Sequence, residues 1–261
     1  YSGRTQEMIH LSSAVNCKIS RIDSVKGRGT FLFLNSLFGY SVTNVYPNRL
    51  TDDDPNDHRG YGIQDSASEN GVISDCSFYR SRHGFTTNGV EPVGDDPSTY
   101  GYSANITLNN CHSFGANSSG FDTHPECYNI VFNNCTSVKT FNAGFSARGN
   151  YVYFNNCISN GDRTGFFVSR EGTNNVHLND CHVIGAIQPY QIYDSTNVYI
   201  DNATHSGTGQ VLSIYRSENV SIKNTSLKLL GTGQFQRLIN IIDSSVSVKG
   251  GVFDLSDHTG T

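Results

Sequence analysis

One short phrase returns along the chain at a nearly constant spacing. It reads Asn-Ile-Thr-Leu-Asn-Asn-Cys in its clearest copy, and four copies end in a cysteine: Cys111, Cys135, Cys157 and Cys181. The steps between these cysteines are 24, 22 and 24 residues. Weaker copies occupy 71–76, 197–202 and 219–224. A fixed period of this length is typical of a repeat architecture, in which equivalent residues of successive repeats stack on one another.

Each copy has the pattern of short strands rather than of a helix. Side chains of opposite character alternate over a few positions, and Val, Ile, Phe, Tyr and Thr dominate, as is typical of β-strands. A second strand begins with Gly-Phe in four copies, at Phe85, Phe121, Phe145 and Phe166. Two or three short strands per period of about 22 residues predict a parallel β-helix. We therefore expect an all-β solenoid of about ten to eleven coils.

Stacking of equivalent residues predicts ladders along the solenoid axis. One ladder should lie at a turn, where side-chain amides bond the rungs above and below, and it comprises Asn110, Asn134, Asn156 and Asp180. The cysteines that follow should form a neighbouring apolar ladder. Parallel neighbours on adjacent rungs rarely have disulfide geometry, so we expect these thiols to be reduced and buried.

The charge and hydrophobicity of the chain argue against two classes of partner, nucleic acids and membranes. Eighteen Lys and Arg residues against 23 Asp and Glu give a net charge of −5, which argues against a nucleic-acid binder with a basic stripe. No stretch of about 18 apolar residues exists, so we expect no membrane span. We expect residues 1–261 to form a single β-helix domain that is a fragment of a longer chain.

Aligning the second strands on their phenylalanines assigns a direction to each residue that follows. Side chains alternate across a strand, so these residues point outward, inward and outward in turn. One outward column then carries Asp122, and the next carries His124 with Arg148 beside it on the following coil. Asp122 and His124 should lie about 6.5 to 7 Å apart on one face. Polar residues are ordinary on a solvated face, but an acid, an imidazole and a guanidinium in register favour a catalytic site.

The segment Ser-Gly-Phe-Asp-Thr-His-Pro-Glu at 119–126, with 143–148 one coil later, resembles the catalytic coil of the mannuronan epimerases and related right-handed β-helix polysaccharide lyases. In that family a Tyr-Gly-Phe-Asp-Pro-His-Glu segment carries the catalytic Asp and His, which match Asp122 and His124. The resemblance spans roughly 105–185 and implies a right-handed, pectate-lyase-like β-helix.

Two positions depart from the family pattern. The catalytic tyrosine of the family falls on Ser119, and its second aspartate falls on Arg148. An arginine beside the histidine is more similar to the lyase half of the superfamily than to the epimerase half. Phage tail-spike depolymerases share this fold, which implies an extracellular or virion-surface location and a homotrimer.

The resemblance implies a carbohydrate-active enzyme that cleaves an extracellular or capsular acidic polysaccharide by β-elimination. Arg148 would neutralise the uronate carboxylate, His124 would act as the base, and Asp122 would orient His124. Glycoside hydrolysis is an alternative in which Asp122 pairs with Glu126 or Glu171. Uronate epimerisation, cleavage of a teichoic-acid-type phosphodiester, and a non-catalytic adhesin or structural spike segment also remain open.

Further polar and aromatic residues lie at the edges of the same face, and we expect them to bind the polysaccharide. They are His83, Asn88, Tyr100, Tyr102, Glu126, Arg163, Arg170 and Glu171. Tyr100 and Tyr102 would stack on sugar rings or pack against the coil.

Two insertions, 46–62 and 89–104, interrupt the repeat next to these rungs and are expected to flank a groove. The first contains Asp52, Asp53, Asp54 and Asp57, which invite a calcium site but lack the spacing of a known calcium loop. We expect a solvated loop there, and no cofactor or catalytic metal.

Overall fold

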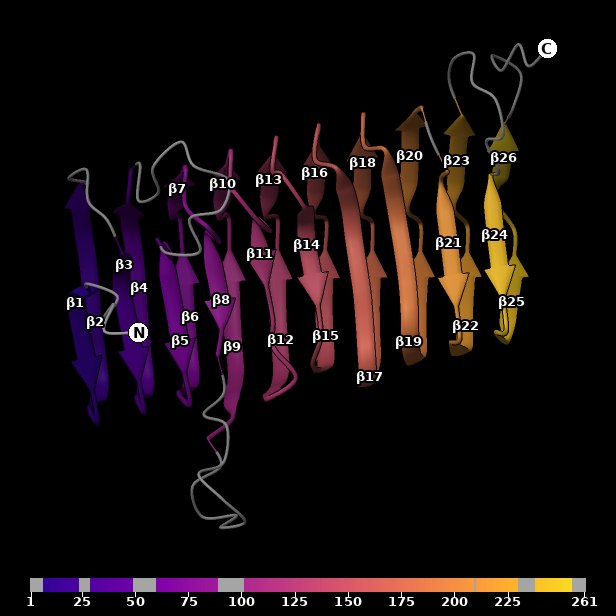
Figure 1. Cartoon of the computed structure of the whole chain (residues 1–261). Coiled ribbons are helices and arrows are strands. Elements are labelled where there is room, and N and C mark those ends of the chain that lie inside the picture. The colour runs from indigo at the N-terminus through magenta and orange to yellow at the C-terminus, as the bar shows by residue number, and fades with distance from the viewer. Residues whose placement is uncertain are drawn as a thin grey trace, which may run out of the picture.

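The computed structural model describes residues 7–23, 29–48, 60–88, 101–208, 210–229 and 238–254. Within these ranges every regular element is a strand, and the strands pair in parallel as stacked coils (Figure 1). The expected all-β solenoid is therefore confirmed. It makes about nine turns, slightly fewer than expected, because some turns take more residues than the repeat, such as the 35 between Cys76 and Cys111. None of the described residues belongs to a helix that would cross a membrane.

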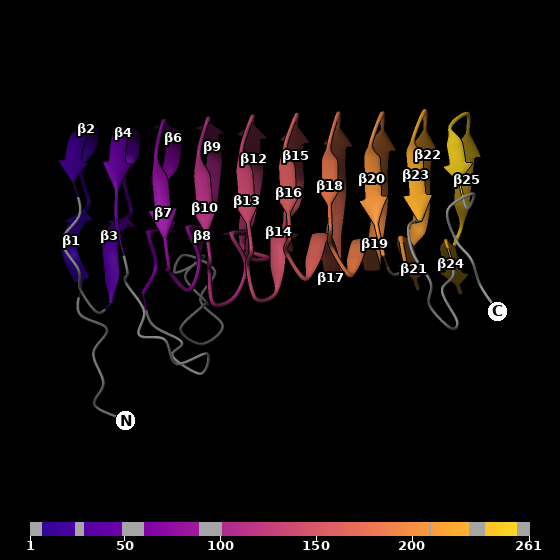
Figure 2. The ribbon, with the colours of Figure 1, turned by 90° about the horizontal axis from the view of Figure 1, so that it is seen from above.

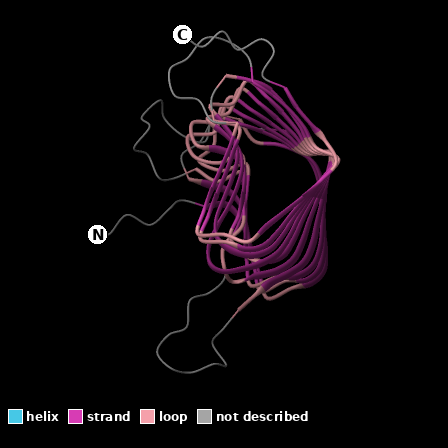
Figure 3. Cartoon of the chain, turned by 90° about the vertical axis from the view of Figure 1, so that its right-hand side faces the viewer, coloured by secondary structure: helices cyan, strands magenta, loops and turns pink. Residues whose placement is uncertain are grey.

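Three stacks of strands form the three sides of each coil, as the end-on view shows (Figure 3). The first stack consists of β1 (Glu7–Ser12), β3 (Thr30–Asn35), β5 (Ile63–Ser66), β8 (Phe85–Thr87), β11 (Phe121–Asp122), β14 (Ala143–Ala147), the first parts of β17 (Thr164–Asn179) and β19 (Gln188–Asp201), β21 (Leu212–Tyr215) and β24 (Ile239–Ile242).

The second stack consists of β2 (Val15–Asp23), β4 (Phe38–Tyr46), β6 (Glu69–Ser74), β9 (Ser103–Asn109), β12 (Cys127–Asn133), β15 (Asn150–Asn155), the remaining parts of β17 and β19, β22 (Glu218–Lys223) and β25 (Val246–Lys249). The third consists of β7 (Ser77–Tyr79), β10 (His112–Phe114), β13 (Thr136–Val138), β16 (Ile158–Asn160), β18 (His182–Ile184), β20 (Thr204–Gly207), β23 (Ser226–Leu229) and β26 (Val252–Asp254). Successive coils follow one another along the axis in sequence order (Figure 2).

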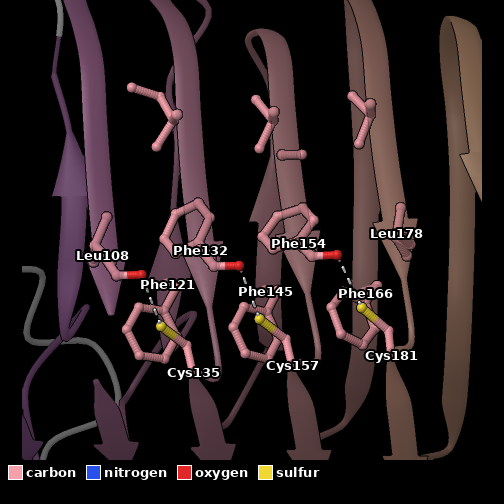
Figure 4. Close-up of a cluster of buried hydrophobic side chains, with 14 of the residues drawn as sticks. Leu108, Phe121, Phe132, Cys135, Phe145, Phe154, Cys157, Phe166, Leu178 and Cys181 are labelled. Atoms are coloured by element: carbon pink, nitrogen blue, oxygen red, sulfur yellow. Dashed lines mark hydrogen bonds between the residues drawn. The ribbon is translucent and has the colours of Figure 1, made fainter. Parts of the chain in front are cut away.

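Aromatic rings from the first two stacks fill the interior between these sides (Figure 4). Phe145 of β14 lies between Phe121 and Phe166, with ring centroids 5.1 and 4.8 Å apart and the rings nearly parallel. Phe154 from the second stack meets Phe145 edge-on at 5.5 Å. These rings are almost fully buried, so the predicted inward direction of the Gly-Phe phenylalanines is correct.

The glycine before each phenylalanine is required by close packing. A Cβ at Gly120 would lie 2.4 Å from Ser137 Oγ on β13 and 2.8 Å from the Gly144 carbonyl oxygen on the next rung. Only a residue without a side chain allows the first and third stacks to approach this closely.

The cysteine ladder is buried and carries no disulfide. All seven cysteines are free, and the five that close the repeat phrase are buried: Cys76, Cys111, Cys135, Cys157 and Cys181. The thiol of Cys157 donates to the Phe132 carbonyl of the preceding rung at 3.5 Å, and Cys181 repeats this contact with Phe154 at 3.4 Å (Figure 4). The prediction of reduced, buried thiols is confirmed.

The turn before each cysteine holds the asparagine ladder. Asn110, Asn134 and Asn156 have φ angles of 52°, 53° and 52°, the left-handed conformation that asparagine tolerates better than most residues. Asn156 Nδ2 donates to Asn134 Oδ1 at 2.8 Å, and Asn134 Nδ2 donates to Asn110 Oδ1 at 3.4 Å. Asp180 has no side-chain N–H to donate to Asn156, so the row of amide hydrogen bonds is interrupted there. Its Oδ1 accepts a hydrogen bond from Asn202.

A second ladder runs beside the first and was not anticipated from the sequence. Side-chain amides link its members at 2.9 to 3.0 Å: Asn109, Asn133, Asn155 and Asn179. These residues end the second-stack strands, so the corner of the solenoid is closed by two parallel rows of amides.

Candidate active site

The outer face of the first stack carries the candidate site. The register pairs Asp122 with Thr86 on the preceding rung and with Ser146 on the following one, so these side chains form one column along the axis. Phe121 on one side of Asp122 and Thr123 on the other are completely buried in the core. Asp122 therefore points away from the interior of the solenoid, as predicted.

Four side chains converge on the carboxylate of Asp122. Its Oδ2 lies 3.3 Å from Nε2 of His124 and 3.8 Å from Nε2 of His83, and it forms an ion pair with Nη2 of Arg148. Thr86 Oγ1 donates a longer hydrogen bond to the same oxygen at 3.4 Å. The structure thus brings Asp122, His124 and Arg148 together, while their catalytic role remains a prediction.

Asp122 is only 1% exposed, although it points outward, because these neighbours cover it. Burial raises the pKa of this carboxyl, but the nearby His83, the hydrogen bond with His124 and the charge of Arg148 outweigh burial and hold the pKa well below its usual range. A carboxylate that stays ionised accepts and orients hydrogen bonds, and it is a poor proton donor.

Two inward threonines fix the backbone of the cluster. The His124 backbone N–H donates to Thr87 Oγ1 at 2.8 Å, and the Arg148 backbone N–H donates to Thr123 Oγ1 at 3.0 Å. The Nε–H of Arg148 also donates to the Thr123 carbonyl at 3.2 Å. The side chains of His124 and Arg148 remain 30% and 27% exposed, whereas that of Asp122 is 1% exposed.

Asp122 also selects the tautomer of His124. A carboxylate only accepts hydrogen bonds, so the Nε2 that faces Asp122 carries the proton in the neutral imidazole. The lone pair then lies on Nδ1. This arrangement leaves His124 able to take up a proton on Nδ1 and places the resulting positive charge next to an ionised carboxylate.

His83 lies against Asp122 from the preceding coil. Its ring is 4% exposed, and Nδ1–H donates to the Ser119 carbonyl at 3.0 Å. Burial lowers the pKa of His83 to about 4 despite the opposing effect of Asp122. We expected His83 to bind substrate, but it is buried, and its ring instead covers one side of the Asp122 carboxylate.

Tyr61 belongs to the same cluster and was missed by sequence reasoning. Its ring stacks on His83 at 5.6 Å, the guanidinium of Arg82 lies 5.3 Å from its centroid, and its hydroxyl accepts a hydrogen bond from Arg82. Burial raises the pKa of Tyr61. Tyr61 lies at the end of the 46–62 insertion, outside the repeat, so no periodic signal in the sequence aligns it with His83.

The other predicted binding residues fall in different places. Tyr102 is 55% exposed and precedes Ser103, which pairs with Cys127, so Tyr102 lies beside half-buried Glu126 on the neighbouring rung. Asn88 is half-buried at the end of β8, and its backbone N–H bonds the Asp65 carbonyl at 2.6 Å.

Arg163, just before β17, and Arg170, within it, lie at different levels along the strand. Arg163 and Arg170 are both exposed, but they flank the first part of this strand. Arg170 follows Ser169, the position that continues the column of Arg148. Arg163 precedes Ser169 by six residues, which separates it from that level by about 20 Å along the strand. The substrate-binding roles expected of Arg163 and Arg170 remain predictions, and of the two only Arg170 lies near the level of Arg148 along the strand.

Several predictions fall outside what the structure describes. Tyr100 and the side chain of Glu171 are among them, and so are most of the expected groove walls, at 49–59 and 89–100. The aspartates of the first insertion lie in the same range. Within the described ranges, no group of three or more His, Cys, Asp and Glu side chains has an arrangement that would hold a metal ion.

No protein-family model and no curated protein sequence matches this chain. Solved structures do match its fold. Endo-xylogalacturonan hydrolase from Aspergillus tubingensis superposes with a TM-score of 0.67 at 14% identity, over 99% of this chain and 90% of that one. PfbA, a surface adhesin of Streptococcus pneumoniae, gives 0.57 at 12% identity, over 90% and 70%.

The enzymatically active domain of tailspike protein 2 from bacteriophage CBA120 gives a TM-score of 0.58 at 11% identity, and the match covers 88% of this chain and 38% of that one. At these identities the likeness shows a shared parallel β-solenoid and no more. None of the three is described as a lyase or an epimerase, so the resemblance to that family remains a prediction.

Proposed function

We propose that this chain is a carbohydrate-active enzyme that cleaves an acidic polysaccharide by β-elimination at the Asp122 cluster. The observation that carries the proposal is the buried, ionised Asp122 bound to both His124 and Arg148. The fold supports it, because two of the matching structures are a polysaccharide hydrolase and the enzymatically active domain of a tailspike.

In this mechanism His124 Nδ1 removes the proton next to the uronate carboxyl group. The electron pair of that C–H bond forms the new C=C bond, and the glycosidic C–O bond breaks on the neighbouring carbon. The imidazolium of His124 returns the proton to the leaving oxygen, so protons balance over the cycle. Arg148 stabilises the enolate-like charge, because its guanidinium has five N–H donors and the contacts with Asp122 and Thr123 use only part of them.

The state of Asp122 favours elimination over hydrolysis. A glycosidase of the usual kind needs one carboxyl group with a raised pKa as the acid and a second carboxylate about 5 to 9.5 Å away. The pKa of Asp122 is shifted in the opposite direction, and the side chain is too buried to attack a sugar carbon. Hydrolysis is the second candidate because the fold matches a hydrolase over nearly its whole length, and Glu126 would then be the accessible carboxylate.

Product analysis separates these possibilities. Purified protein is incubated with polygalacturonate, alginate, hyaluronate, a wall teichoic acid and neutral dextran, and near-ultraviolet absorbance and reducing ends are followed together, with released phosphomonoester measured for the teichoic acid. Elimination yields a conjugated double bond and hence absorbance that rises with the reducing ends. Reducing ends without absorbance support hydrolysis, and the absence of both products on all five polymers contradicts an enzyme of this class.

The variant His124→Ala tests the assignment of the base. We expect it to lose about 10²- to 10⁴-fold in kcat, as is typical when a general base is removed, with little change in Tm because the side chain is partly exposed. His177→Ala is the matched control, since His177 lies half-exposed between Tyr153 and Tyr199 on the outer face of the second stack. Full turnover in the His124 variant excludes this residue from the mechanism.

A further inference from the structure

Aromatic side chains continue the outer face of the first stack beyond the Asp122 cluster. The register of β14, β17, β19 and β21 places Phe167 in the column of Asp122, two rungs further along the axis. Tyr193 and Tyr215 lie in the neighbouring column, which also contains His124 and Arg148. All three aromatic side chains are half-buried, and Tyr193 contacts Phe167 and Tyr215 edge-on at 5.9 and 5.8 Å.

Two hollows adjoin this aromatic row and share Arg216. One has a volume of about 270 Å³ and is lined by Tyr193, Tyr215 and Arg216. The other has a volume of about 600 Å³, and its lining includes Arg170, Asp194 and Arg216. The smaller hollow therefore lies beside the face that carries the candidate active site, and the larger one lies at the corner where the first stack meets the second.

A bulge in β17 forms one wall of the larger hollow. Ser169 pairs with Tyr193 and Thr173 pairs with Ser195, so three residues of β17 lie opposite the single residue Asp194. Arg170 in this bulge has a φ of 109°, a conformation that is strained for a residue with a side chain. Bulges and strained residues of this kind cluster beside functional sites, where they redirect side chains.

An ion pair also lines the larger hollow. Arg216 Nε and Nη2 donate to the two carboxylate oxygens of Asp194 at 2.6 and 2.9 Å. The guanidinium of Arg216 also lies 5.6 Å from the ring centroid of Tyr215. A planar, bidentate pair beside an aromatic ring offers both hydrogen-bonding groups and an apolar face.

A sugar ring has matching properties, because it packs its C–H face on an aromatic ring while its hydroxyls bond charged groups at its edge. Rungs are about 4.8 Å apart, so Tyr193 and Tyr215 lie about 14 and 19 Å along the axis from His124. A sugar unit is about as long as one rung spacing. We propose that Phe167, Tyr193, Tyr215 and the Arg216–Asp194 pair form a row of saccharide subsites that holds the polysaccharide about three to four units from the bond broken at the Asp122 cluster.

This inference rests on the proposed function and adds to it that the polysaccharide lies along the solenoid axis toward the C-terminal coils. It predicts an enzyme that cleaves within long chains. Oligosaccharides too short to reach from His124 to Tyr193 should be poor substrates, with a raised KM.

The test measures binding separately from cleavage. Native gels containing polygalacturonate, alginate, hyaluronate or dextran are used to obtain dissociation constants for the full chain. We expect the wild type to be retarded by at least one acidic polymer, and Tyr193→Ala/Tyr215→Ala to bind that polymer at least tenfold more weakly. Tyr153→Ala/Tyr199→Ala, which removes two half-buried tyrosines from the outer face of the second stack, should bind like the wild type.

A ring-preserving variant guards against misfolding. Tyr193→Phe/Tyr215→Phe keeps the aromatic faces and should retain binding within about threefold. A loss of structure that did not depend on the aromatic faces would instead weaken polymer binding in both double variants. Wild-type affinity in the alanine variant, or no retardation of the wild type by any of the four polymers, overturns the proposal.

The result is distinguishable from a failure of the proposed function. If His124→Ala still turns over the polymer while the tyrosine variant loses binding, the elimination mechanism fails and the subsite row stands. If His124→Ala is inactive and the tyrosine variant binds and cleaves long chains normally, the subsite row fails alone.

Discussion

Two buried aspartates show how the surroundings of a residue decide its chemistry. Asp122 points outward and meets His83, His124 and Arg148, so its pKa is lowered. Asp65 points inward, in a column with Leu34 and Thr87, and its carboxylate accepts hydrogen bonds from Tyr40 Oη at 2.8 Å and from Ser103 Oγ. Burial raises the pKa of Asp65 to about 6, because these neutral donors offset only part of the cost of a charge in the core.

Asp65 should therefore make the protein less stable as pH rises. Its folded-state pKa of about 6 exceeds the value of about 3.9 expected in the unfolded chain, so the folded state binds the proton more tightly. Its contribution is about 3 kcal/mol in all, falls by about 2 kcal/mol between pH 4 and pH 6, and is nearly lost by pH 7. Asp65→Asn, which is neutral throughout, removes this contribution, so the free energy of unfolding of the variant should rise relative to the wild type by about 2 kcal/mol between pH 4.5 and pH 7, as urea unfolding would measure.

Asp122 acts in a different window and with the opposite sign. Because its folded-state pKa is lowered, its contribution is present above about pH 4 and is lost only as the pH falls below that value. His83 and His205, whose pKa values burial lowers to about 4, act with the opposite sign between pH 4.5 and pH 7, so the effect of Asp65 is read from the difference between the wild type and Asp65→Asn. An unchanged pH dependence in Asp65→Asn contradicts the assignment of this cost to Asp65.

At the scale of the element, each coil is closed by short strands and by turns in which asparagine adopts the left-handed conformation at a low cost in free energy. The left-handed conformation at Asn134 and the two amide bonds that link it to neighbouring rungs come from the same side chain. The parallel strands themselves supply the backbone pairing, and the amide ladders fix the register between rungs at the corner.

Substitutions at Asn134 separate the contribution of the amide hydrogen bonds to stability from that of the left-handed conformation. Asn134→Ala removes both amide bonds and places a less tolerant residue at a φ of 53°, so we expect a loss of about 2 to 4 kcal/mol in the free energy of unfolding. Asn134→Gly also removes the bonds but adopts this conformation freely, so it should lose about 1 kcal/mol less. Urea unfolding of both variants checks the order, and equal losses would show that conformation plays no part.

At the scale of the whole molecule, one continuous core runs through the described coils and encloses the cysteine ladder. Phenylalanine stacks, aliphatic residues and thiols alternate along it without a disulfide. The coils contact mainly their neighbours along the axis, so the integrity of the core depends on all rungs being in register.

The rate at which the cysteine thiols react with a reagent in solution measures whether the core is closed. Burial raises the pKa of Cys127 and of Cys181 to about 12, so neither is a thiolate at neutral pH. We expect a thiol-reactive chromophore to label at most Cys17, which is only half-buried, in the native protein, and all seven cysteines in denaturant. Rapid native labelling of more than one thiol would contradict the closed core.

The repeat by itself determined the parallel solenoid, the inward phenylalanines, the reduced cysteine ladder and the shared outer face of Asp122, His124 and Arg148. All of these follow from a period of about 22 residues, since a constant period dictates which residues stack. Tertiary structure alone decided the burial of Asp122, the packing of His83 beside it and of Tyr61 on His83, and the hollows beside Arg170 and Arg216. These features arise where an insertion or a bulge breaks the period, and there the packing of residues distant in the sequence determines the contacts.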